Sequence, residues 1–195
     1  MKKLLAVVLA TLFANGALLA KDSGAEGWQI SAGLHMSKFK VESESENNTP
    51  ISLAIAKEIM KTKSGDLLLE ASLMTPEKYE LSYYGIVDIE IKTKMVFFGS
   101  LYYQFNTSVP SLKPYAGLGL GLAFLEAKGG FCVTGYCESD STSDTSLAYQ
   151  LAIGANYFFN KNVAAGLGYA IRDYGSIEDV NVDSSGLFLS ATYKF

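Results

Sequence analysis

The sequence has few of the residues from which protein-only active sites are usually built. It contains one histidine and two cysteines among 195 residues, which leaves little for a zinc site or a histidine-based triad. Only 18% of the residues are charged, and 20 acidic against 16 basic side chains give a net charge of −4. Because phosphate contacts need clustered positive charge, nucleic acid is not an expected partner. We also expect no metal and no cofactor.

The chain also lacks a long hydrophobic run. Its longest apolar segment, Leu4–Phe13, covers about ten residues, whereas a membrane-spanning helix needs about 20. Two lysines precede this segment and a polar stretch follows it, which is the order of a secretory signal peptide. We expect cleavage after Ala20, with Gly16 or Ala17 as alternatives. The expected organisation is a signal peptide at residues 1–20 and one mature domain at residues 21–195.

Export places the two cysteines in an oxidising compartment. Cys132 and Cys137 lie five positions apart, and Gly135 between them eases a tight loop. We therefore expect one disulfide bond between Cys132 and Cys137. The alternative is that the two cysteines form half of a metal site. Such a site would need a second cysteine pair or a nearby histidine, and the sequence has neither.

What the sequence has in abundance is alternation with a period of two. In the last segment, odd positions from Leu187 to Phe195 are apolar, whereas Ser190, Thr192 and Lys194 are polar. No segment after residue 26 has the period of a helix. Eight segments alternate, near residues 28–37, 51–55, 67–73, 89–105, 116–124, 148–159, 162–172 and 187–195.

The two faces of these segments differ in side-chain size. One face is broadly apolar and aromatic, whereas the other is mostly Gly, Ala and Ser instead of the long charged side chains of a soluble sheet. Small residues suit the narrow lumen of an eight-stranded barrel, and large apolar residues suit lipid. We predict an all-β fold, namely an eight-stranded antiparallel up-and-down transmembrane β-barrel. A soluble lipocalin-like barrel is the alternative.

The connections between these segments alternate in length. Long connections are expected at about 40–50, 75–88, 126–146 and 173–185, and short ones near Lys61–Asp66, Asn106–Lys113 and Phe159–Asn162. If both termini face the periplasm, the long loops face the cell exterior. The cysteine pair then lies in the third and longest loop.

Glycine alternates with larger apolar residues in Pro114–Gly121, and two later segments contain Tyr149–Tyr157 and Gly168-Tyr169. These motifs resemble the glycine-alternating strand and the later strands of the small outer-membrane β-barrel family, which includes the OmpA barrel, OmpX-like proteins and Opa-like surface antigens. Tyr193 and the final Phe195 resemble the C-terminal signal that the outer-membrane insertion machinery reads. The resemblance implies a multi-pass barrel in the outer membrane of a Gram-negative bacterium. No OmpA-type peptidoglycan-binding domain is expected after Phe195.

The alternation also assigns charged side chains to the lumen. By this register six point inward, namely Glu58, Glu70, Lys92, Lys94, Arg172 and Lys194. Buried charges must be paired or hydrated, so the lumen either is plugged by ion pairs or contains a narrow, gated ion path. We favour the plug. Acidic residues of the long loops are expected to form a solvated surface, because none has the ligand spacing of a calcium loop.

His35 and Ser37 form a His-x-Ser pair that resembles the catalytic pair of the outer-membrane lipid A deacylases. In that family the pair lies late in the chain and an acid follows it. Here the pair lies in the first strand and points inward. We therefore expect an ordinary lumen histidine and no catalytic residue.

These observations favour a non-enzymatic outer-membrane protein whose long loops serve membrane integrity, adhesion or an antigenic role. The alternatives are a narrow channel for ions or small solutes and, less favoured, a lipid-modifying enzyme. The expected partners are membrane lipids, lipopolysaccharide and the insertion machinery, and the expected state is a monomer.

Overall fold

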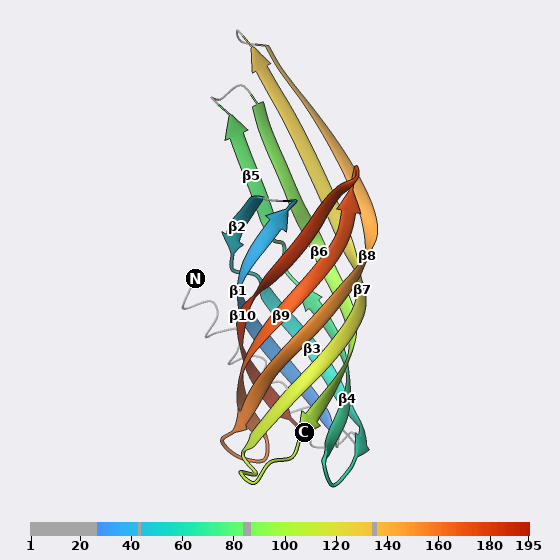
Figure 1. Cartoon of the computed structure of the whole chain (residues 1–195), viewed down its shortest axis with the longest axis vertical. Helices are drawn as coiled ribbons and strands as arrows, with labels where there is room; N and C mark the ends of the chain where they lie inside the picture. The colour runs from blue at the N-terminus through green and yellow to red at the C-terminus, as the bar shows by residue number, and fades with distance from the viewer. Residues whose placement is uncertain (1–26, 43, 84–86, 134–135) are drawn as a thin grey trace.

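The computed structural model describes residues 27–42, 44–83, 87–133 and 136–195, and most of them form one antiparallel sheet (Figure 1). No helix that could span a bilayer occurs among these residues. The expected signal peptide and its cleavage site at Ala20 lie outside them. The strands are β1 (Trp28–Val41), β2 (Glu44–Asn48), β3 (Ile51–Lys61), β4 (Gly65–Met74), β5 (Lys78–Tyr83), β6 (Val87–Phe105), β7 (Leu112–Val133), β8 (Tyr136–Phe158), β9 (Val163–Ile177) and β10 (Val180–Lys194).

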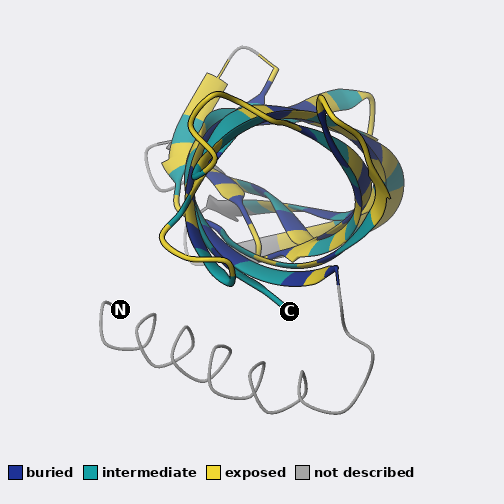
Figure 2. Cartoon of the chain, turned by 90° about the horizontal axis from the view of Figure 1, so that it is seen from below, coloured by how far each residue is buried: buried dark blue, intermediate teal, exposed yellow. Residues whose placement is uncertain are grey.

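The sheet closes into a barrel because its first and last strands pair. β1 and β10 are antiparallel partners from Gln29↔Lys194 to Val41↔Val182. The ring is formed by β1, β3, β4, β6, β7, β8, β9 and β10, each hydrogen-bonded to its neighbour, and Figure 2 shows it from one end. The expectation of an eight-stranded up-and-down barrel is therefore confirmed.

Two strands of the wall are interrupted by prolines. β2 and β3 both pair with β1, and β4 and β5 both pair with β6. Pro50 and Pro76 lie in the two gaps, where a residue without an N–H group cannot continue the ladder. The Asn48 side chain bridges the gap between β2 and β5, since its amide donates to the Lys78 carbonyl at 2.8 Å and its oxygen accepts from the Lys78 N–H at 3.1 Å.

The two ends of the barrel differ. At the terminus end the β3–β4, β6–β7 and β8–β9 connections are short, and the Phe195 N–H donates to the Trp28 carbonyl at 2.9 Å. The opposite end carries the β1–β2, β5–β6, β7–β8 and β9–β10 connections and is called the hairpin end (Figure 1). Most of the residues expected to form the long connections, such as 126–133 and 136–146, are instead in strands, so these connections are extended hairpins. β6, β7 and β8 therefore rise well beyond the ring.

Exposure alternates along the ring strands as predicted. On β8, Leu151 and Ile153 are 60% and 62% exposed, whereas Gln150 and Ala152 are 7% and 3% exposed. The same pattern on the other ring strands gives the barrel an apolar outer surface and a lumen of smaller or polar side chains. An exterior of exposed leucine, isoleucine and aromatic residues is typical of a barrel in lipid.

Candidate functional site

Apolar side chains fill the lumen at the hairpin end. Phe39, Leu125 and Tyr174 are fully buried there, and the ring centroids of Phe39 and Tyr174 lie 6.1 Å apart. We call this layer the apolar plug: Phe39, Val41, Met74, Tyr79, Ile91, Val96, Phe98, Ala123, Leu125, Ala148, Tyr174, Ile177 and Val182. Because an eight-stranded barrel has room only for its own inward side chains, such a layer leaves little space for solvent.

One carboxylate is buried within this layer. Glu77 is 0% exposed and lies in the proline-containing gap between β4 and β5. Its carboxylate accepts hydrogen bonds from the hydroxyl groups of Tyr174 at 2.5 Å, Ser184 at 2.9 Å and Ser37. The backbone N–H of Glu77 donates to Thr93 Oγ1 at 2.9 Å. These bonds hold the gap segment against the inner wall and satisfy a charge that would otherwise be costly to bury.

Sequence reasoning missed Glu77 because residues 75–88 were expected to form an external loop. The available signal was the Thr75-Pro76 step, which breaks the strand and turns the next residue out of the regular alternation.

A chain of polar side chains crosses the lumen below the plug. Arg172 Nη2 lies 2.8 Å from His35 Nδ1, and Arg172 Nε donates to Gln150 Oε1 at 3.0 Å. Gln150 donates to the Tyr102 hydroxyl at 3.0 Å. His35 Nε2 lies 2.8 Å from Ser52 Oγ. His35 therefore lies buried in the lumen between Arg172 and Ser52.

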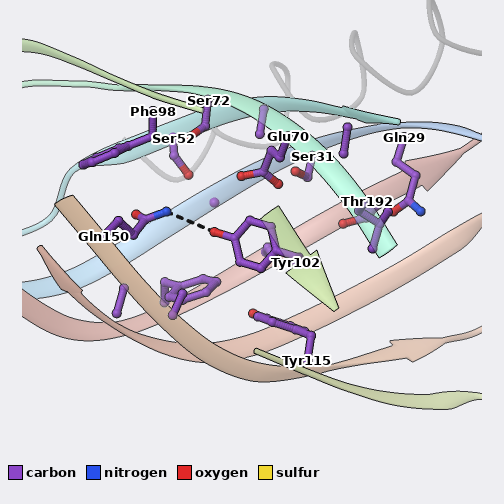
Figure 3. A pocket seen from close by; sticks show the side chains of 18 of the residues that line it. Gln29, Ser31, Ser52, Glu70, Ser72, Phe98, Tyr102, Tyr115, Gln150 and Thr192 are labelled. Atoms are coloured by element: carbon purple, nitrogen blue, oxygen red, sulfur yellow. Dashed lines mark hydrogen bonds between the residues drawn. The ribbon is translucent and has the colours of Figure 1, made fainter. Parts of the chain in front are cut away.

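These side chains border a cavity of about 100 Å³ that extends toward the terminus end (Figure 3). Its lining combines polar side chains, among them Ser31, Ser72, Tyr115, Gln29 and Thr192, with apolar ones such as Leu68 and Phe188. A cavity of this size has room for several water molecules. The lumen thus carries polar side chains at the terminus end and an apolar layer at the hairpin end.

Four of the six charged residues assigned to the lumen lie there. Glu70 and Arg172 both line the cavity. Glu58 and Lys194 form an ion pair of 2.8 Å at the terminus end, where Lys61 also lies 2.8 Å from Glu58. The inward charges are thus divided between the cavity and its mouth instead of forming one network.

The other two, Lys92 and Lys94, do not point into the lumen. The β6–β7 register shifts between Thr93 and Met95, so Lys94 is the extra residue of a β-bulge. Thr93 and Ile91 are buried on the inner face, which places both lysines on the outer face. The inward assignment of Lys92 and Lys94 was wrong because an unbroken alternation was carried through the bulge.

The two lysines instead belong to a charged ladder on the outer face of β6 and β7, formed by Glu90, Lys92, Lys94, Glu126 and Lys128. Glu126 lies 2.6 Å from Lys94 and 3.0 Å from Lys128, and Lys92 lies 2.7 Å from Glu90. Hydrogen bonds from Lys94 and Lys128 lower the pKa of Glu126 to about 2. The ladder lies just beyond the outward apolar pair Met95 and Phe124 toward the hairpin end, and we take it as the boundary of the apolar belt.

The remaining expected features are only partly described. The backbones of Cys132 and Cys137 are direct partners in the β7–β8 ladder, but their side chains lie outside the described part, so the disulfide stays a prediction. Tyr193 and Phe195 pack edge to face, with ring centroids 5.2 Å apart. In the described part of the chain, no group of three or more His, Cys, Asp or Glu side chains could hold a metal ion.

The fold and its apolar exterior define a class, that of integral β-barrel membrane proteins. Residues 5–195 match the family model described as the outer membrane protein beta-barrel domain. The chain belongs to this family and is a protein of the Gram-negative outer membrane, in contact with its lipids. No curated protein matches the chain in sequence.

Solved structures of small outer-membrane barrels share the fold. Neisserial surface protein A has 21% identity and a TM-score of 0.61, covering 89% of this chain and 100% of that one. Ail, the attachment invasion locus protein of Yersinia pestis, has 22% identity and a TM-score of 0.54, covering 87% and 99%. OprG from Pseudomonas aeruginosa has 14% identity and a TM-score of 0.55, covering 88% and 97%. At these identities the likeness concerns the fold alone.

Proposed function

We propose that this protein is a non-enzymatic, non-conducting barrel that displays its hairpins at the cell surface. The observation that carries the proposal is the apolar plug, in which Phe39, Leu125 and Tyr174 are fully buried across the lumen. A conducting path would need a continuous polar route, and the polar cavity ends beneath this layer. The displayed hairpins then serve adhesion, membrane integrity or recognition as a surface antigen.

The orientation follows the general rule for outer-membrane barrels, which have short periplasmic turns and longer extracellular segments. The terminus end carries the short connections, and the hairpin end carries β6, β7 and β8, which extend past the apolar belt. We infer that the hairpin end is extracellular and that the chain functions as a monomer. Tyr193 and Phe195 are the residues that the insertion machinery would read.

Two observations support the absence of catalysis at His35. Its ring nitrogens contact Arg172 and Ser52, and its ring stacks on Phe188 with centroids 5.1 Å apart. Ser37 donates to Glu77 instead of pairing with His35. Both side chains face the lumen, away from lipid. If the protein were a lipid-modifying enzyme, His35→Ala would abolish deacylation of lipid A, and we expect no such activity in the unmodified protein.

Surface display is tested by labelling single cysteines with a membrane-impermeant maleimide on intact cells. In a Cys132→Ser, Cys137→Ser background, Ser141→Cys reports the β7–β8 hairpin and Ser108→Cys reports the opposite β6–β7 turn. Both serines are exposed. We expect Ser141→Cys to be labelled on intact cells and Ser108→Cys only after permeabilisation, and the reverse pattern would refute the orientation.

A further inference from the structure

One edge of β8 has no partner strand beyond the ring. β9 pairs with β8 only from Tyr149 to Phe158, and beyond Asp173 it continues along β10. Toward the hairpin end, β8 pairs with β7 on one side, and no strand among the described residues pairs with its other side. Ser146 marks the end of β9 cover, since its hydroxyl donates to the Ser176 carbonyl at 2.9 Å. We call residues 139–145 on this side the open edge. An unpaired strand edge is a template for the addition of another strand.

The direction of each backbone group on this edge can be derived from the ladder. The Phe158 N–H donates to the Ser111 carbonyl on the β7 side, and the Phe159 N–H donates to the Val163 carbonyl on the β9 side. The β7–β8 ladder has no register shift, so even-numbered N–H groups point to β7 and odd-numbered ones point away from it. The open edge therefore presents the N–H groups of Ser139, Ser141, Ser143 and Thr145.

Two of these N–H groups are capped by aspartates. The Ser141 N–H donates to Asp140 Oδ1 at 2.7 Å, and the Thr145 N–H donates to Asp144 Oδ1 at 2.7 Å. Because side chains alternate, both aspartates lie on the same face of β8, about 14 Å apart at ~3.4 Å per residue. The caps protect the edge against indiscriminate pairing, since they occupy backbone donors and add negative charge.

We propose that the open edge of β8 binds an extended polypeptide segment that carries two basic side chains four residues apart. The inference rests on the proposed surface orientation. In an added strand, residues four apart lie on one face and meet Asp140 and Asp144 as cross-strand neighbours. The basic groups draw the carboxylates away from the Ser141 and Thr145 N–H groups, which then donate to carbonyls of the incoming segment. A neutral or acidic segment leaves both caps in place.

Charge argues against a second copy of this chain as the occupant. The register that overlaps residues 139–145 of two copies fully is centred on Thr142, and it would set Asp140 of one copy opposite Asp144 of the other, where like charges are unfavourable. The edge also lies beyond the exposed Leu147 and Tyr149, the outermost apolar residues on this strand's outer face, so it is in water and not in lipid. A soluble basic segment satisfies both conditions.

The test uses the full mature chain, folded in detergent micelles and labelled with nitrogen-15. The probe is a blocked heptapeptide with lysine at positions two and six and threonine or valine elsewhere. A second peptide has glutamate at both lysine positions. We expect the lysine peptide to bind and to shift the amide signals of Ser141 and Thr145 most strongly, whereas the glutamate peptide does not bind.

The matched variants remove the same charge at two places. Asp140→Asn with Asp144→Asn should weaken binding about tenfold, because it removes both of the exposed charges that the two basic side chains would meet. Asp179→Asn with Asp183→Asn, on the β9–β10 hairpin, should leave it unchanged. The proposal is refuted by no binding at millimolar peptide, by equal binding of the glutamate peptide, or by unchanged affinity of the Asp140/Asp144 variant.

This experiment is independent of the proposed function, because it needs no intact cell. If the peptide binds but Ser141→Cys is labelled only from the periplasmic side, the edge is a real site and the surface orientation is wrong. If labelling is as expected and the peptide does not bind, the orientation stands and the open edge is not a binding site.

Discussion

Replacing Leu120 with arginine tests whether the exposed belt of the barrel lies in lipid. Leu120 is 55% exposed on the outer face of β7, in a row of outward residues from Leu112 to Phe124. Twelve residues at ~3.4 Å, tilted by about 40°, span about 31 Å, so Leu120 lies about 5 Å from the middle of the belt. Arginine near the bilayer midplane destabilises a barrel by about 2–4 kcal/mol, and we expect Leu120→Arg to fall in this range.

The matched control is Ser139→Arg, which is also outward and exposed but lies on β8 beyond the charged ladder that bounds the apolar belt. We expect its free energy of unfolding to change by less than about 0.5 kcal/mol, as for most surface substitutions. The assay is urea unfolding in phospholipid vesicles, followed by the fluorescence of Trp28, the single tryptophan. Equal stability of the two variants would show that residues 112–124 do not face lipid and would refute the outer-face assignment.

Three further predictions concern the plug, the charged ladder and the cysteines. Phe39→Ala should destabilise the barrel by about 3–5 kcal/mol in the same assay, because the ring is fully buried, and a neutral result would contradict the packing of the plug. The carboxyl of Glu126 should titrate near pH 2 in nuclear magnetic resonance spectra, and Lys94→Met should move its midpoint toward 4.5. Because the pKa of Glu126 is lowered in the folded state, the stability from this pairing is present above pH 4.5 and is lost as the pH falls toward 2. Cys132→Ser with Cys137→Ser should cost at most about 2 kcal/mol for so short a loop and still give a folded, heat-modifiable barrel, whereas failure to fold would contradict this account.

Much of the fold could be predicted because successive side chains of each ring strand face the lumen and the lipid in turn. Leu151, Ile153 and their neighbours follow the period of two without interruption, so inner and outer faces were assigned correctly on β8. Closure also followed from physical chemistry, because an unpaired strand edge is too costly in hydrocarbon.

The lumen was harder to predict because it depends on local departures from that alternation. The bulge at Lys94 reverses the faces of the upper part of β6, and no residue type there marks it. Glu77 enters the lumen at a proline-containing gap, and its hydroxyl partners Ser37, Tyr174 and Ser184 come from strands far apart in the sequence. Such contacts are set by tertiary packing, which a single sequence does not display.

The hairpin end was mispredicted for a related reason. Serine, threonine, aspartate and glycine between Glu126 and Ser146 are typical of loops, yet β7 extends to Val133, β8 begins at Tyr136, and the two strands are paired. Their pairing is sustained by cross-strand contacts and by the neighbouring β6, so the polar composition reflects exposure to water on both faces instead of irregular backbone.

The central claim, that the apolar plug closes the lumen, is tested most directly by conductance of the refolded protein in planar lipid bilayers. The account predicts no reproducible current steps from the unmodified protein at membrane potentials that leave the bilayer intact. Uniform single-channel steps from purified, heat-modifiable protein would contradict it and would favour the narrow channel instead.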